Sequence, residues 1–143
     1  MIWKATMLKK YFLLMLFCLF FPVLATASKA SKADKALQAS LDSYALAIRW
    51  SDFEAAISAL DPTIIREDNY LDNIEATYKE IQVTAYNLKS AAYVDPLTYQ
   101  QRVEVRYIDI NTQVEKSLVD KQAWRYDAVA KRWWLVSGLP ILD

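Results

Sequence analysis

The stretch from Arg102 to Pro140 limits the possible folds most, because apolar and polar residues alternate along it. Such alternation predicts strands with one face buried and the other in water. We expect a two-residue loop at Asn111-Thr112, since asparagine tolerates the positive φ that such a loop requires. A second hairpin turns over residues 127–131 and returns through the aromatic run Arg132–Leu135. This part of the chain therefore predicts two long antiparallel hairpins.

The loop at Asn111-Thr112 also predicts the register, with Val105 opposite Leu118 and Val103 opposite Asp120. In this register the covered face of the sheet carries Val103, Val105, Tyr107, Leu118, Asp120, Gln122, Trp124 and Tyr126. The wet face carries Arg102, Glu104, Arg106, Ser117, Lys121 and Arg125. A slip of one residue would exchange the two faces, so this prediction depends on the loop.

The second hairpin brings an aromatic pair into the sheet. If Tyr126 faces Trp133, then Trp134 points outward beside Arg125, where a guanidinium can stack on the indole. The sequence alone leaves open which of the two tryptophans faces the core.

Upstream of the hairpins the apolar period becomes helical. Apolar residues recur every three or four positions from Asp34 to about Trp50, which predicts a helix of about four turns. Residues 51–54 read Ser-Asp-Phe-Glu and predict a capping box, in which Ser51 and Glu54 cap a second, short helix. Asp61-Pro62 ends that helix.

The segment between the second helix and the hairpins is the least regular. Residues 70–74 predict a single helical turn, and from Lys79 the period becomes two. Ile81, Val83 and Ala85 then share one face of a first strand, with Tyr86 on the other. Asp95-Pro96 separates this strand from the next, over residues 98–110. The chain is thus predicted to be α+β, with two or three N-terminal helices packed on a curved antiparallel sheet of about four strands.

The first residues resemble an export signal. Three lysines precede the apolar run Tyr11–Leu24, and Ala25-Thr26-Ala27 supplies small residues for a cut before Ser28. The run of about 14 residues spans about 21 Å as a helix, which is short of the roughly 30 Å of a bilayer core. We therefore expect a signal peptide over residues 1–27 and a periplasmic or secreted location. The alternative is an uncleaved leader that tethers the domain to the inner membrane.

The predicted mature chain has a flexible N-terminus over residues 28–35 and one domain over residues 36–143. The sequence has no histidine, and its single cysteine, Cys18, lies in the leader, so the predicted mature chain contains neither residue. Of 17 basic residues three lie in the leader, so 14 remain against 17 acidic ones, a net charge of −3. No basic field is present to attract phosphates, which argues against nucleic acid as a partner.

Two segments carry a resemblance to a known family: Ile48–Ala56, at the corner between the helices, and Trp124–Leu135, the last hairpin. Together with the order of elements, they resemble the nuclear transport factor 2-like superfamily, whose cystatin-like α+β fold is a cone. The last hairpin is also similar to that of small exported bacterial proteins of this type without an assigned role. The resemblance implies a curved sheet wrapped around the first helix and a pocket inside it, but no reaction.

Composition excludes several kinds of catalytic centre. Without histidine there is no Ser-His-Asp or Cys-His system and no histidine-bound zinc, and one glycine cannot form a phosphate-binding loop. What remains is polar groups on the covered face of the sheet. The residues that we expect to line a pocket are Tyr44, Trp50, Tyr107, Asp120, Gln122 and Trp124. The alternative is that the aromatic residues among them are simply core.

Asp120 and Tyr107 are the candidate catalytic residues. The resemblance implies this pairing, because ketosteroid isomerase of this superfamily uses an aspartate base with a tyrosine as oxyanion donor. The structural alternative places Asp120 in water at the rim, or in an ion pair with Lys116 or Lys121.

We expect an exported binding or interaction domain without catalytic machinery, cofactor or metal, acting on a partner protein or a small apolar ligand. The alternatives are a small isomerase-like enzyme and a membrane-tethered domain. A homodimer formed through the sheet would fit the open sheet face.

Overall fold

The computed structural model describes residues 31–66 and 69–142. The expected signal peptide, residues 1–27, lies outside them. Within the described ranges no helix is both long enough and apolar enough to cross a membrane.

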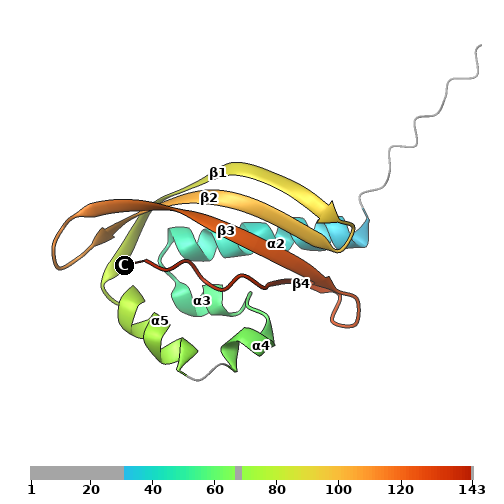
Figure 1. Ribbon diagram of the computed structural model, residues 1–143, viewed down its shortest axis with the longest axis horizontal. Helices are drawn as coiled ribbons and strands as arrows, with labels where there is room; N and C mark the ends of the chain where they lie inside the picture. The colour runs from blue at the N-terminus through green and yellow to red at the C-terminus, as the bar shows by residue number, and fades with distance from the viewer. Residues whose placement is uncertain (1–30, 67–68, 143) are drawn as a thin grey trace, which may run out of the picture.

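Helices come first and strands second, so the chain is α+β as predicted (Figure 1). The strands form one antiparallel four-stranded sheet in the order β1-β2-β3-β4. The helices are α2 (Lys32–Arg49), α3 (Phe53–Ile57), α4 (Pro62–Ile65) and α5 (Tyr70–Tyr78). The strands are β1 (Ile81–Asp95), β2 (Thr98–Asp109), β3 (Glu115–Asp127) and β4 (Arg132–Leu135).

α2 begins two residues earlier than the sequence predicted. The Ser31 hydroxyl accepts from the Asp34 amide and the Asp34 carboxylate accepts from the Ser31 amide, so a capping box starts the helix at Lys32. The segment predicted to be flexible therefore overlaps the first turn of α2. Figure 1 shows α2 lying along one face of the sheet, where Tyr44 and Ile48 are buried.

The capping box predicted for the second helix is wrong. Asp52 is the N-cap of α3 and accepts from the Ala55 amide, while Ser51 adopts φ 55°. The Ser51 hydroxyl instead accepts from the Val83 amide on β1, at 2.9 Å. Val83 is 32 residues further along the chain, so the local sequence around Ser51 does not reveal this hydrogen bond.

Two further helices replace the irregular segment. Asp61 caps α4, in which Pro62 holds the first position, where its missing N–H is no loss. α5 is nine residues long rather than the single turn predicted. The Tyr78 hydroxyl donates to the Pro140 carbonyl and so joins α5 to the C-terminal segment.

β1 differs most from the prediction. Its pairing with β2 shifts by one residue at Val83/Ala85, again at Leu88/Ser90 and again at Tyr93/Asp95. Each bulge inserts a residue and changes which side chains point inward. Tyr86 is therefore buried and Ala85 is not, the reverse of the predicted alternation.

The hairpin register is confirmed, although its loop is not. Val105 pairs with Leu118 and Val103 with Asp120. Strand pairing stops at Ile108 and Glu115, so the loop is longer than two residues. The Asp109 carboxylate accepts from two loop amides, and the positive φ falls on Gln113. The observed loop gives the same strand register as the predicted two-residue loop. The predicted assignment of these residues to the two faces of the sheet is therefore confirmed.

β4 settles the orientation of the aromatic pair. Trp133 pairs with Tyr126 and is fully buried, and its Nε1 donates to the Ala33 carbonyl of α2 at 2.8 Å. Trp134 points to the other face. The core on the covered face is formed by Leu37, Tyr44, Ile48, Val103, Val105, Tyr107, Trp124, Trp133 and Leu135.

Candidate functional site

A cluster of buried polar side chains lies on the covered face of the sheet, and Gln122 is at its centre. The Gln122 amide nitrogen donates to Asp120 Oδ2 at 2.7 Å, and its carbonyl oxygen accepts from Gln101 Nε2 at 2.6 Å. The Tyr86 hydroxyl lies 3.1 Å from Gln122 Nε2. Trp124 Nε1 donates to Gln122 Oε1 at 3.4 Å. We call Tyr86, Gln101, Asp120 and Gln122 the polar cluster.

Three strands build the polar cluster through their alternation. Asp120 and Gln122 share one face of β3, and Gln101 lies directly opposite Gln122 on β2. Tyr86 reaches the cluster from β1 because the bulge after Val83 turns it inward. Each of these four side chains is less than a tenth exposed.

Asp120 is buried, so the predicted alternative that places it in water at the rim is wrong. Burial disfavours the charged carboxylate and raises the pKa of Asp120 to about 6, although the hydrogen bond from Gln122 opposes the rise. Lys121, one of the two lysines considered as partners, is exposed on the opposite face. A carboxyl with a pKa of about 6 is mostly ionised at pH 7 and can accept a proton there.

Tyr86, a member of the polar cluster, and the nearby Tyr44 are both buried tyrosines. Burial raises the pKa of the Tyr86 hydroxyl to about 12, while the Arg49 guanidinium lies 5.5 Å from its ring centre. Tyr44 is 2% exposed, and its hydroxyl has no hydrogen-bond partner among the described residues. Burial, and then the charge of Asp120, raise the pKa of Tyr44. Its ring meets the ring of Trp124 edge-on, with centroids 5.4 Å apart.

The structure brings together most of the predicted pocket residues. Tyr44, Asp120, Gln122 and Trp124 are neighbours, but Trp50 is 80% exposed at the C-cap of α2 and lies outside the cluster. Tyr107 is buried on the same face.

Tyr107 is distant from Asp120 along the sheet. On β2 it follows Val103, which faces Asp120, by four residues, or about 13 Å. Tyr86 is instead joined to Asp120 through Gln122.

Sequence reasoning missed two members of the polar cluster. Gln101 has the same parity as Val103 and Val105, so alternation along β2 could have identified it. Tyr86 was hidden by the bulges, but the spacing of the β1 residues that share the covered face contains a signal, although those from Leu88 onward are exposed. That spacing is two, three, two, three, two over Ile81, Val83, Tyr86, Leu88, Ala91 and Tyr93.

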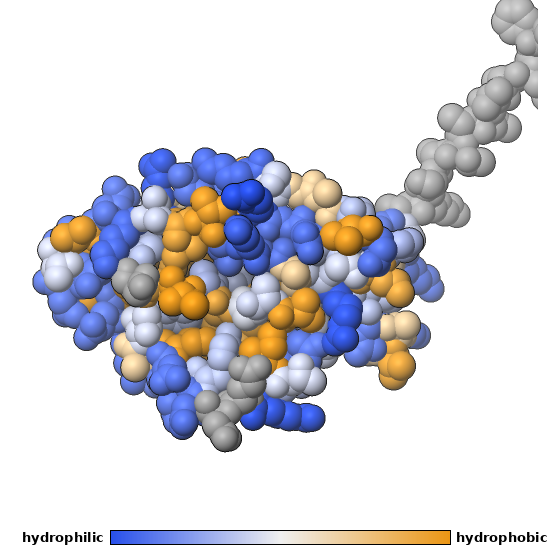
Figure 2. Space-filling model, viewed as in Figure 1, coloured by the Kyte–Doolittle hydropathy of each residue, from blue (hydrophilic) through white to orange (hydrophobic). Residues whose placement is uncertain are grey.

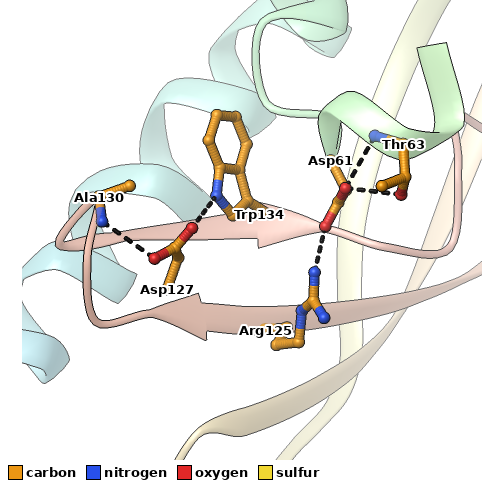
Figure 3. Close-up of polar contacts among 6 residues, drawn as sticks. All are labelled: Asp61, Thr63, Arg125, Asp127, Ala130 and Trp134. Carbon is orange, nitrogen blue, oxygen red and sulfur yellow. Dashed lines mark hydrogen bonds and ion pairs between the residues drawn. The ribbon is translucent and has the colours of Figure 1, made fainter. Parts of the chain in front are cut away.

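A second polar group lies where β3 and β4 meet α4 (Figure 3). Asp61 Oδ1 accepts from the Thr63 hydroxyl at 2.7 Å and from the Thr63 amide at 2.9 Å. The Arg125 guanidinium donates to the other oxygen, Asp61 Oδ2. The bonds from Thr63, followed by Arg125, hold the pKa of Asp61 below its usual range.

This arrangement corrects the stacking predicted for Trp134. Because Arg125 is engaged by Asp61, it is Arg132 that lies over the indole of Trp134, 3.8 Å from the ring centre. Trp134 Nε1 donates to the Asp127 carboxylate at 3.3 Å (Figure 3).

Beside Tyr44 a cleft of about 380 Å³ opens between α2 and α3. Small side chains of the two helices form most of its walls, and Tyr44 and Trp133 also line it. Tyr44, which lines this cleft, contacts Trp124, and Trp124 donates a hydrogen bond to Gln122 of the polar cluster.

Carboxylates do not gather into a metal site in the described parts of the chain, where no group of three or more metal-binding side chains occurs. The polar cluster, together with Tyr44, offers a buried carboxyl group, two amides and two tyrosine hydroxyls. Such a set can bind a polar ligand group or exchange a proton with it.

Neither the protein-family models nor the curated proteins compared with this sequence match it.

Proposed function

We propose that the protein is an exported binding domain that holds a small ligand between α2 and the covered face of its sheet. The ligand has an apolar body and a polar group that meets the polar cluster. The observation that carries this proposal is the burial of Asp120, Gln122, Gln101 and Tyr86 near a Tyr44 hydroxyl that has no hydrogen-bond partner among the described residues. Apolar side chains in these positions would give a more stable core, so the polar ones indicate a role in binding.

The proposal includes the nuclear transport factor 2-like fold with its cone shape. Support comes from the three bulges of β1, since bulges bend a strand and increase its twist. It also includes export by a cleaved leader. N-terminal sequencing of the exported protein is expected to begin at Ser28, whereas a chain that keeps Met1 in the membrane fraction would establish the tethered alternative.

Native mass spectrometry of the exported protein tests the binding role. We expect a retained small molecule in the wild type and less of it in Asp120→Asn, which loses the charge but keeps the acceptor for Gln122. Asp42→Asn, an exposed change on α2, is the matched control and is expected to retain the molecule. A wild-type protein without any bound molecule would overturn the proposal.

A second candidate is a small isomerase-like enzyme in which Asp120 is the base. The raised pKa of Asp120, about 6, favours it, because a general base works best when its pKa is near the working pH. In this reading Tyr86 joins the predicted Tyr107 as a candidate donor. Carbon-detected NMR titration of the carboxyl groups decides: an Asp120 pKa near 4 would remove the enzyme hypothesis.

The exposed face of the sheet is the proposed surface for a homodimer. Val119 on β3 is 46% exposed, among charged neighbours. Sedimentation equilibrium is expected to show a dimer, and a monomer at high concentration would remove this part of the proposal.

A further inference from the structure

A groove of about 650 Å³ runs between α3 and α5, away from the polar cluster. The rings of Phe53 and Tyr78 stack in it, with centroids 3.9 Å apart and planes 24° from parallel. Ile57 and Ile74 are half-buried beside them, and Leu71 is 37% exposed. Figure 2 shows apolar surface, with hydrophilic residues around it, on the side of the molecule where α3 and α5 lie. The groove therefore has an apolar floor that is open to the surroundings.

The rim of this groove carries excess negative charge. Asp52 and Glu54 lie on the α3 side, and Glu75 and Lys79 on the α5 side. Lys79 pairs with Glu75 at 2.8 Å, so these two charges neutralise each other. Asp52 caps α3, whereas the structure assigns Glu54 no ion pair or hydrogen bond with a described residue. Two negative charges remain for an incoming group.

We propose that the groove between α3 and α5 docks a basic amphipathic helical segment of a partner protein. The apolar face of that helix covers Phe53, Ile57 and Ile74, and its lysines or arginines meet Glu54 and Asp52. A groove between two helices with an apolar floor suits a helix that presents anchors on one face. The charge of the rim selects a basic helix over an acidic one, because like charges brought together at an interface are strongly unfavourable. This site is independent of the ligand site at the polar cluster.

The experiment is a fluorescence anisotropy titration of the exported protein with two labelled helical peptides. Both have leucines on one face, and the other face carries lysine in one peptide and glutamate in the other. We expect the lysine peptide to bind at least about tenfold more tightly than the glutamate peptide. Equal binding of the two peptides, or no binding of the lysine peptide, would overturn the proposal.

Charge-reversed variants separate the groove from the net charge of the protein. The double variant Glu54→Lys/Glu75→Lys is expected to lose about tenfold for the lysine peptide and to gain for the glutamate peptide. The matched control, Asp42→Lys/Glu115→Lys, changes the net charge equally at exposed positions outside the groove. It is expected to bind as the wild type does; an equal loss in the control would show general attraction and overturn the proposal.

The apolar floor has its own test. Leu71→Ser changes an edge of the groove and is expected to weaken the lysine peptide several-fold, with thermal unfolding measured to show that the variant is folded at the temperature of the titration. Unchanged affinity would contradict docking on the apolar floor. Retention of a small molecule by the wild type in mass spectrometry is a separate readout, so the two proposals can fail independently.

Discussion

Asp61 and Asp120 both have little exposed surface, yet their pKa values are shifted in opposite directions. Asp61 is 4% exposed and Asp120 is 8% exposed, so exposure does not distinguish them. Asp61 receives two bonds from Thr63 and one from Arg125, and its pKa is lowered. Asp120 receives a bond from the neutral amide of Gln122, and its pKa rises to about 6. Burial raises the pKa of Asp120 more than its single hydrogen bond lowers it, whereas at Asp61 the hydrogen bonds from Thr63 outweigh the effect of burial.

The difference separates a structural aspartate from a candidate functional one. Asp61 joins α4 to the sheet: its side chain caps the helix and holds Arg125 on β3, and its amide donates to the Leu135 carbonyl on β4. The side-chain contacts with Thr63 and Arg125 stabilise the fold with the carboxyl charged. The charge of Asp120 stabilises nothing comparable, which is why we place a ligand there.

The largest expected effect is that of Asp120→Asn. The folded pKa of about 6 lies above the ordinary value near 4, so the folded state holds a proton that the unfolded chain releases between these pH values. The contribution of Asp120 to stability is therefore fully present below about pH 4 and is lost as the pH rises through about 6, by about 3 kcal/mol in all. The asparagine cannot ionise, and its amide oxygen still accepts from Gln122. We expect it to be up to about 3 kcal/mol more stable at pH 8.

Urea unfolding followed by tryptophan fluorescence at pH 4 and pH 8 measures this effect. Asp42→Asn, an exposed change on α2, is the control and is expected to stay within about 0.5 kcal/mol of the wild type. Equal stabilities of Asp120→Asn and the wild type at pH 8 would contradict a raised pKa.

Asp61→Ala is expected to have the next largest effect, in the opposite direction. It removes the cap of α4 and the partner of Arg125, and we expect a loss of about 2 kcal/mol at pH 7. Because the folded pKa is lowered, the wild-type advantage is present above about pH 4 and is lost as the pH falls through the folded value. The same urea experiment, repeated at pH 7 and pH 3, measures it. A loss at pH 7 below about 0.5 kcal/mol would show that the contacts of Asp61 contribute little.

Tyr44→Phe tests whether the buried hydroxyl next to the polar cluster costs stability. The hydroxyl that is removed is buried without a described partner, so we expect a gain of about 1 kcal/mol in the free energy of unfolding. Thermal unfolding by circular dichroism is the measurement. A clear loss of stability would show that the hydroxyl is hydrogen-bonded in solution and that, like Asp61, it stabilises the fold through its contacts.

Arg125→Met is expected to have the smallest effect. The Arg125 side chain is 59% exposed, so water screens its attraction to Asp61, and we expect a loss of less than about 1 kcal/mol. Thr63 continues to donate to Asp61 in this variant. A loss as large as that of Asp61→Ala would mean that the ion pair, rather than the cap, stabilises Asp61. Urea unfolding of the two variants side by side distinguishes these outcomes.

The candidate site was predictable where the strands are regular. Alternation along β3 placed Asp120, Gln122 and Trp124 on one face, and the predicted register was confirmed although its loop was not. Prediction failed on β1, where each bulge reverses the alternation and so concealed Tyr86. It failed again at Trp50, because an aromatic residue at a helix end can point to the core or to water with the same local pattern.

By itself the sequence determined the α+β order of elements, the register of the hairpins and the absence of histidine chemistry. These depend on residue type and on local periodicity, both of which are present in the chain before it folds. Only the tertiary structure decided that Ser51 binds the amide of Val83, that Tyr86 joins Gln122, and that Asp61 and Asp120 have opposite pKa shifts. The physical reason is that the desolvation and hydrogen bonding of a side chain depend on neighbours that are distant in the sequence, and only folding brings those neighbours together.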